Sequence, residues 1–170
     1  MSPPKAHQAR LPIETVSVVG AGGNGSIFIT HLCRIHQAWT RLGGSPFKIT
    51  IYDPDRVSPA NLARQVFCEA DIGQPKAQVL ALRMRAFFGI PVEHHVGRFN
   101  ANPMYGTVDQ LVVGCVDNLA ARRTMADLTA PRTNRIKRWG QERKDKFGGA
   151  YWLDLGNENN PGQVVLSGPG

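Results

Sequence analysis

The chain has 170 residues and a mass of 18.6 kDa, which is enough for one domain with a single hydrophobic core. Its 42% hydrophobic and 19% charged residues exclude a chain that is mainly disordered. No stretch of about 18 consecutive apolar residues occurs, so no membrane-spanning helix is predicted. The 20 Lys and Arg residues against 13 Asp and Glu give a net charge of +7, which raises the hypothesis of a nucleic-acid partner.

The positive charge is concentrated in one segment, residues 122–146. This segment holds nine basic and three acidic residues, so six of the seven net positive charges lie in it. A protein that coats nucleic acid carries positive charge over a whole surface, so nucleic-acid binding is not expected. The segment is either a solvated loop or, as a hypothesis, a loop that meets an acidic partner surface or the phosphates of a nucleotide.

The three cysteines form no recognisable framework. Cys33, Cys68 and Cys115 are far apart and include no C-x-x-C pair, so neither a disulfide scaffold nor a zinc ribbon is predicted. We expect all three to be packing residues. Free cysteines fit a reducing cytoplasm, and residues 1–12, expected to be flexible, contain no apolar run of the secretory type.

Apolar and β-branched runs alternate with stretches of helical spacing along the chain. The expected strands are residues 15–19, 47–52, 92–96, 111–116, 150–153 and 163–166. The expected helices are residues 27–42, residues 75–88, and a third that opens at Asp117 or Asn118 and ends before Pro131. A basic loop is expected at residues 131–149.

This alternation predicts an α/β fold in a single domain over residues 1–170. Parallel neighbours need a crossover, so we expect a Rossmann-like, doubly wound, mostly parallel sheet with helices on both faces. Ligands of such sheets bind at the carboxyl ends of the strands. The residues that follow each strand are therefore the candidates for function.

Glycines follow the first expected strand and open the first expected helix. Gly20, Gly22 and Gly25 match G-x-G-x-x-G in this context, and Gly23 makes the turn less obstructed still. Backbone N–H groups at such a helix start favour a phosphate. The pattern indicates a nucleotide and, on its own, an NAD(P)-dependent oxidoreductase; the alternative is a tight turn without a ligand.

An acidic residue, Asp53, ends the second expected strand, where a carboxylate accepts hydrogen bonds from ribose hydroxyls. It lies 28 residues beyond Gly25, later than the spacing of about 20 in the dinucleotide pattern. A longer helix and loop absorb the difference. The alternative is an Asp that starts a turn before Pro54.

Two basic residues follow in the next loop and helix start. Arg64 lies in the run from Asn61 to Gln65, and Lys76 ends the run that begins at Gly73. A dinucleotide pyrophosphate is held mainly by backbone amides, whereas a triphosphate that loses pyrophosphate needs cations where charge develops. The alternatives are a surface salt bridge for Arg64 and a solvated helix-start residue for Lys76.

Asp117 ends the most apolar expected strand and is the candidate magnesium ligand. A hard carboxylate beside the phosphates suits Mg²⁺, which keeps several of its waters. The alternative is a helix N-cap, a role open to Asp117 or Asn118. Together, the residues after the strands predict ATP with Mg²⁺, used for nucleotidyl transfer.

The chain resembles the ThiF/MoeB adenylyltransferases, bacterial relatives of ubiquitin-activating enzymes. The resemblance covers about residues 15–125, and within the family the chain looks most like the ThiF-like component of the PRTRC plasmid cassette. The matching pieces are Gly20-Ala21-Gly22-Gly23-Asn24-Gly25-Ser26, Asp53-Pro54-Asp55-Arg56-Val57, Asn61-Leu62-Ala63-Arg64-Gln65, Gly73-Gln74-Pro75-Lys76 and Cys115-Val116-Asp117-Asn118.

The resemblance implies that the C-terminal glycine carboxylate of a small ubiquitin-like protein attacks the α-phosphate of ATP. It assigns catalytic roles to Arg64, Lys76 and Asp117, with Asp117 as the metal ligand. The implied nucleotide-binding residues are Gly20, Gly22, Gly23, Gly25, Asp53, Asn61, Arg64, Gln65, Lys76, Asp117 and Asn118. Family members are usually homodimers, and in some an N-terminal Arg reaches the partner's site; Arg10 is the candidate here.

The chain also departs from the family pattern. Asn24 stands where an apolar residue is usual, and the family's zinc-binding cysteine pairs are absent, so no zinc is expected. No cysteine follows Cys115, although many relatives carry a later one that forms a thioester or persulfide. We therefore expect a truncated enzyme or one that only adenylates. A further alternative is a non-catalytic nucleotide-binding or docking module.

Overall fold

The computed structural model describes residues 13–99, 111–129, 136–138, 141–143, 151–157 and 162–168. Its centre is a six-stranded sheet in the order β3-β2-β1-β4-β7-β8. The strands are β1 (Thr15–Val19), β2 (Lys48–Tyr52), β3 (Val92–His95), β4 (Leu111–Gly114), β7 (Tyr151–Asn157) and β8 (Gly162–Ser167). Neighbours pair in parallel from β3 to β7, and only β8 runs antiparallel, to β7. The predicted Rossmann-like, mostly parallel sheet is confirmed.

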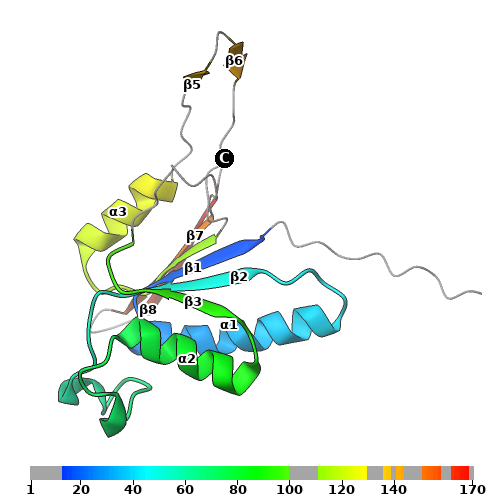
Figure 1. Cartoon of the computed structure of the whole chain (residues 1–170). Coiled ribbons are helices and arrows are strands. Elements are labelled where there is room, and N and C mark those ends of the chain that lie inside the picture. Colours follow the sequence, from blue (N-terminus) through cyan, green and yellow to red (C-terminus); the bar gives the residue numbers. More distant parts are fainter. Residues whose placement is uncertain are drawn as a thin grey trace, which may run out of the picture.

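Helices cover both faces of this sheet, as predicted (Figure 1). Helices α1 (Gly23–Arg41) and α2 (Lys76–Phe88) lie on one face, and α3 (Leu119–Thr129) lies on the other. Helix α1 begins four residues before its expected start, because the last glycines of the turn already form its first turn. In the described part of the chain, no helix is long and apolar enough to cross a membrane.

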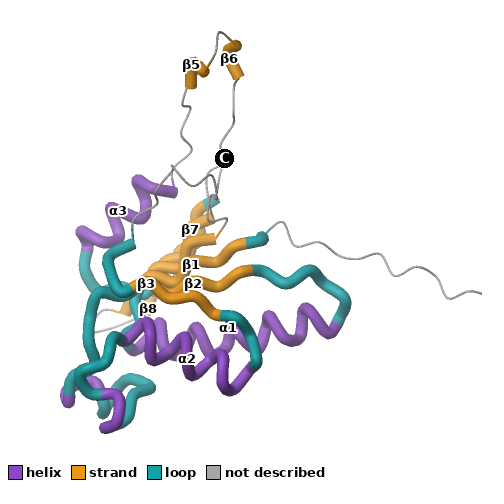
Figure 2. The backbone as a smooth tube through the Cα atoms, in the orientation of Figure 1, coloured by secondary structure: helices purple, strands orange, loops and turns teal. Residues whose placement is uncertain are grey.

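The connections contain short elements that the sequence patterns did not predict. Two 3₁₀ turns, η1 (Pro59–Asn61) and η2 (Glu69–Asp71), lie in the loop between β2 and α2. Figure 2 shows this loop in teal, with the 3₁₀ turns as short purple pieces. The expected basic loop contains a short antiparallel pair, β5 (Ile136–Arg138) with β6 (Gln141–Arg143), so the prediction of a simple loop there was wrong.

Alternating side chains of the central strand serve two cores. Val16 and Val18 of β1 belong to the larger hydrophobic cluster, which includes residues of α1 and α2. Val19 belongs to a smaller cluster with Val112 of β4 and Met125 of α3. A strand that is buried on both faces is rich in apolar residues, as β1 is with three valines, and the one polar residue between them, Ser17, is buried as well.

The sheet order fixes where a ligand binds. From β1 the chain adds β2 and β3 on one side, and β4 returns to the other side of β1. Val19 pairs with Tyr52 of β2 and with Gly114 of β4, so these three strands end at the same edge. The segments that leave this edge diverge to opposite faces of the sheet, which opens the crevice that binds ligands in doubly wound folds.

Candidate functional site

A cavity of about 900 Å³ lies at the carboxyl ends of β1, β2 and β4. It is lined by the glycine turn after β1, the loop after β2, the start of α2, and the segment from β4 into α3. Ten of the eleven predicted nucleotide-binding residues line this one cavity: Gly20, Gly22, Gly23, Asp53, Asn61, Arg64, Gln65, Lys76, Asp117 and Asn118. The eleventh, Gly25, is not among the lining residues.

Two glycines of the turn are required by the chain's own packing. Gly20 has φ +100°, which other residues rarely adopt, and a Cβ there would lie 2.6 Å from the carbonyl oxygen of Cys115. A Cβ on Gly25 would lie 1.9 Å from the carbonyl oxygen of Gly20. These glycines therefore let the turn, the start of α1 and the end of β4 approach one another closely.

The other two glycines have no such packing requirement. A Cβ on Gly22 would meet only Nε2 of Gln65 at 3.8 Å, and one on Gly23 only the carbonyl oxygen of Arg64 at 3.6 Å. Both glycines line the cavity at the N-terminus of α1. The space that their missing side chains leave belongs to the cavity, so this part of the turn fits a phosphate group at a helix start.

Asp53 links the end of β2 to the glycine turn. Its side chain is buried; Oδ2 accepts the backbone N–H of Ala21 at 2.6 Å and Oδ1 accepts that of Asp55 at 2.8 Å. Burial raises the pKa of this carboxyl, and the two N–H donors oppose the rise. The carboxylate lines the cavity between the turn and the next loop, where it can also accept from a ribose hydroxyl.

The loop after β2 presents Asn61 and Arg64 to the cavity. Asn61 is buried, and its Oδ1 accepts hydrogen bonds from the backbone N–H and the hydroxyl of Ser58, at 2.9 and 3.1 Å. The amide Nδ2 is thus the group that remains for a phosphate oxygen. Arg64 is exposed, and within the described residues it forms no salt bridge, so the alternative of a surface ion pair is not supported there.

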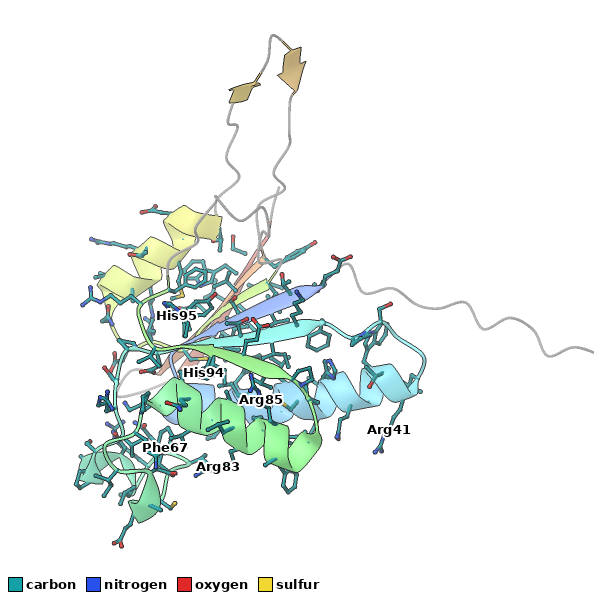
Figure 3. All side chains as sticks on the ribbon, in the orientation of Figure 1. Arg41, Phe67, Arg83, Arg85, His94 and His95 are labelled. Carbon is teal, nitrogen blue, oxygen red and sulfur yellow. The ribbon has the colours of Figure 1, made fainter. Side chains whose placement is uncertain are left out.

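Helix α2 holds this loop through a contact that the sequence patterns did not reveal. Arg83 donates to the carbonyl of Val66 and, at 2.7 Å, to Oδ2 of Asp71. Figure 3 shows Arg83 on α2 beside the loop that carries Phe67, which is itself buried. Asp71 also accepts the backbone N–H of Cys68 at 2.8 Å. The loop that carries Arg64 is therefore fastened to the helix that begins at Lys76.

Lys76 is buried, which contradicts the alternative of a solvated helix-start residue. It occupies the first position of α2, and its Nζ lies 3.2 Å from Oδ2 of Asp55, whose own side chain is 64% exposed. The backbone N–H of Lys76 also donates to the carbonyl of Asp55. The ammonium group is therefore held at the cavity wall by a partner that faces solvent.

The structure separates the roles of Asp117 and Asn118. Oδ1 of Asn118 accepts the backbone N–H of Ala121 at 2.8 Å, so Asn118 caps α3. Asp117, which is exposed and lines the cavity, is left for a metal ion. No cluster of three or more His, Cys, Asp or Glu side chains suited to a metal occurs in the described ranges. One carboxylate, completed by phosphate oxygens and waters, fits Mg²⁺.

Gln65 is a less obvious member of the site. Its Nε2 lies over Gly22, and its Oε1 is buried and accepts no hydrogen bond from any residue that the structure describes. An unsatisfied buried carbonyl oxygen costs stability, so such groups mark places where a ligand or water completes the bonding.

The far side of the cavity is apolar. Val19, Tyr52, Phe99, Val116 and Met125 line it, and the rings of Tyr52 and Phe99 lie edge to face at 5.1 Å. An apolar, partly aromatic wall of this kind fits a nucleobase. Sequence reasoning missed it because its residues come from five separate segments of the chain.

The cysteines differ from one another. Cys33 is buried in the core, as predicted for a packing residue, and burial raises its pKa to about 11. Cys115 is partly buried, packs against the core and also lines the cavity, and burial raises its pKa to about 12. Cys68 is exposed at the start of η2, so the prediction that it is a packing residue was wrong. Its side chain contributes to capping that 3₁₀ turn.

Some predictions fall outside the described residues. These include Arg10 as a residue that reaches a partner's site, the flexible terminus at residues 1–12, and most of the basic loop at residues 131–149. Among the described residues of the basic segment, Arg122 has a different role from the one expected. Arg122 lies in α3 and forms an ion pair with Asp154 of β7, with both side chains nearly buried, so it is no part of a solvated loop.

Comparison with known proteins supports the family. A model of the ThiF family matches residues 3–135. The SAMP-activating enzyme E1 of Haloferax volcanii is 32% identical over 126 residues, which cover 71% of this chain and 43% of that protein. The NEDD8-activating enzyme E1 catalytic subunit of Saccharomyces cerevisiae is 34% identical over 111 residues, 64% of this chain and 34% of that protein. The chain thus spans less than half the length of these relatives.

Solved structures agree on the fold. Escherichia coli MccB matches with a TM-score of 0.63 and 18% identity, over 92% of this chain and 39% of MccB. The MccB structure with ATP matches with a TM-score of 0.61 and 20% identity, over 92% of this chain and 42% of MccB. The sequence, the fold and the order of the site segments lead to one assignment: the chain belongs to the ThiF family.

Proposed function

We propose that this chain is an adenylation domain that uses ATP and Mg²⁺ to activate the C-terminal glycine carboxylate of a small ubiquitin-like protein. The observation that carries the proposal is the single cavity lined by the glycine turn, Asp53, Arg64, Lys76 and Asp117. Two relatives are named as activating enzymes, for SAMP and for NEDD8, which supports an acyl-activating role for this chain.

In the proposed reaction, a carboxylate oxygen of the terminal glycine attacks the α-phosphorus of ATP. A new oxygen–phosphorus bond forms, and the bond from the α-phosphorus to the bridging oxygen of the β-phosphate breaks. The products are the acyl-adenylate and pyrophosphate, and the negative charge of the transition state grows on the leaving bridging oxygen. Groups that hold positive charge beside that oxygen therefore lower the barrier.

The chain's own residues divide this task. Arg64 offers a planar fork for two phosphate oxygens, and Lys76 offers a point charge fixed at the cavity wall. Gly22 and Gly23 give phosphate oxygens access to the N–H groups at the start of α1. Asp53 orients the ribose. Magnesium, held by Asp117 with phosphate oxygens and waters, would neutralise charge on the triphosphate.

A stepwise experiment tests the proposal. ATP binding is measured first by calorimetry, with NADH in a parallel titration. We expect ATP to bind with Mg²⁺ and NADH not to bind; strong NADH binding without ATP binding would establish the oxidoreductase alternative instead. Exchange of labelled pyrophosphate into ATP is then measured with a small ubiquitin-like protein that ends in glycine. A chain that binds ATP but shows no exchange with a verified partner is a docking module and not an enzyme.

Variants assign the roles. Arg64→Ala and Asp117→Ala are each expected to abolish exchange while the chain stays folded by circular dichroism. Arg41→Ala is the matched control for Arg64, because Arg41 is an exposed arginine at the end of α1 and does not line the cavity. Normal exchange in Arg64→Ala or Asp117→Ala would refute the roles given to those residues.

We further propose that the chain forms a homodimer in the cytoplasm. We also propose that a single domain carries the function and that the chain belongs to the PRTRC group. The free thiols support a reducing compartment. The resemblance to the ThiF/MoeB adenylyltransferases, which are usually homodimers, supports the dimer. Analytical ultracentrifugation of the purified chain tests the dimer: a monomer at micromolar concentration contradicts it.

A further inference from the structure

The backbone around Asp117 is held from both sides by one residue. Nη2 of Arg122 donates to the carbonyl of Val116 at 3.3 Å, and the backbone N–H of Arg122 donates to the carbonyl of Asn118 at 3.3 Å. Val116 and Asn118 are the chain neighbours of Asp117. The bond to Asn118 is the ordinary backbone bond of the first turn of α3, whereas the bond to Val116 comes from the arginine side chain. The guanidinium of Arg122 therefore holds the peptide group that directly precedes Asp117.

The guanidinium of Arg122 is fixed in turn by Asp154. Nε of Arg122 lies 3.4 Å from Oδ2 of Asp154, and the two side chains are only 11% and 4% exposed. A buried ion pair of this kind contributes little net stability, because removing two charges from water costs about as much as their attraction returns. A structural requirement for the exact position of the arginine explains the pair better than stability does.

The neighbouring residues leave Asp154 little freedom. Its Oδ1 lies 3.2 Å from where a Cβ of Gly114 would be, and the end of the Met125 side chain fills the rest of that space. Neither Arg122 nor Asp154 lines the cavity, so neither touches a bound nucleotide. The pair reaches the site at two places, through the carbonyl of Val116 next to Asp117 and through Met125 of the apolar wall.

We propose that Arg122 and Asp154 are positioning residues that hold the Asp117 carboxylate in the direction needed to bind Mg²⁺ with the nucleotide phosphates. The inference rests on the proposed function and adds to it a pair from α3 and β7. Residues that orient a metal ligand without touching the metal change metal affinity by roughly ten- to a hundredfold when they are replaced. The pair therefore sets how much Mg²⁺ the site needs, while the contacts to ATP itself are made elsewhere.

The test compares Asp154→Asn and Arg122→Lys with the unaltered chain. ATP binding is measured by calorimetry without divalent ions, and then with increasing Mg²⁺ to find the concentration that gives half of the maximal gain in affinity. We expect both variants to bind metal-free ATP within about twofold of the unaltered chain but to need roughly ten- to a hundredfold more Mg²⁺. Electron paramagnetic resonance of Mn²⁺ with ATP gives a second reading of metal affinity.

Arg123→Ala is the control, because it removes one positive charge from the same helix at an exposed position. It is expected to keep the Mg²⁺ requirement of the unaltered chain. Arg122→Lys keeps the buried charge but cannot contact Val116 and Asp154 together, so it tests the idea even if Asp154→Asn does not fold. A folded variant with an unchanged Mg²⁺ requirement overturns this inference alone, whereas an unaltered chain that binds no ATP overturns the proposed function as well.

Discussion

Two glycines of the turn, Gly22 and Gly25, are predicted to fail in opposite ways when each is replaced by alanine. A Cβ on Gly25 would lie 1.9 Å from the carbonyl oxygen of Gly20, so a shift of more than an ångström is needed in backbone that also contacts Cys115. Overpacking of this kind costs about 1–3 kcal/mol, and the contact with backbone puts Gly25→Ala at the upper end, roughly 3 kcal/mol. For a chain of this length that lowers Tm by roughly 6–12 °C.

Gly22→Ala meets no atom closer than 3.8 Å and has a φ of −76°, so its Tm is expected to stay within about 2 °C of the unaltered chain. Its methyl group enters the cavity, where the proposed phosphate approaches the backbone. ATP affinity is therefore expected to fall by roughly tenfold, about 1.4 kcal/mol. Differential scanning fluorimetry and calorimetry measure the two properties. If Gly25→Ala were as stable as the unaltered chain, or if Gly22→Ala bound ATP normally, the division of the glycines into two roles would be wrong.

Three further outcomes are expected. Lys76→Met folds at least as stably as the unaltered chain, because a buried ammonium is replaced by an apolar group of similar size, yet it loses ATP affinity; a clear loss of stability would contradict this. Burial lowers the pKa of His36 below its ordinary 6.5, so the unfolded chain takes up a proton first and Tm falls as the pH falls below about 6.5; His36→Gln flattens this fall, and an equal fall in both proteins would argue against it. Maleimide at neutral pH labels Cys68 in the folded chain but not Cys33, and labelling of Cys33 would show that its thiol is not buried as described.

Features that depend on local pattern were predictable from the sequence. The bounds of β1 are those expected from its β-branched run, and Gly20 and Asp53 lie where strand ends place them. The parallel sheet could be predicted from the alternation of strands and helices. Because crossover connections between parallel strands are almost always right-handed, only a few sheet topologies are possible. The cavity lined by most of the predicted residues is a consequence of that order, since the carboxyl ends of adjacent parallel strands share an edge.

Features that depend on pairs distant in sequence were not predictable. Asp154 and Arg122 are 32 residues apart, and nothing in either local sequence distinguishes a buried ion pair from two surface charges. Nothing in the sequence around Arg83 shows that its side chain fastens the loop at Val66. The choice between Asp117 and Asn118 as helix cap was open for another reason: either side chain is chemically competent, and only the backbone direction decides.

The burial of charge around the cavity supports an anionic ligand over a purely structural role. Asp53 and Lys76 are both more than nine-tenths buried, although removing a charge from water costs several kcal/mol unless partners replace the hydration. Asp53 is compensated by two backbone N–H groups, but Lys76 has an ion-pair partner, Asp55, that is itself mostly solvated. An ammonium held in this way is costly in the free protein and is satisfied when a polyanion enters. Positions that lower local stability in this way are usually functional. The buried position of Lys76 is therefore stronger evidence for an anionic ligand than the glycine motif, which many nucleotide-binding folds share.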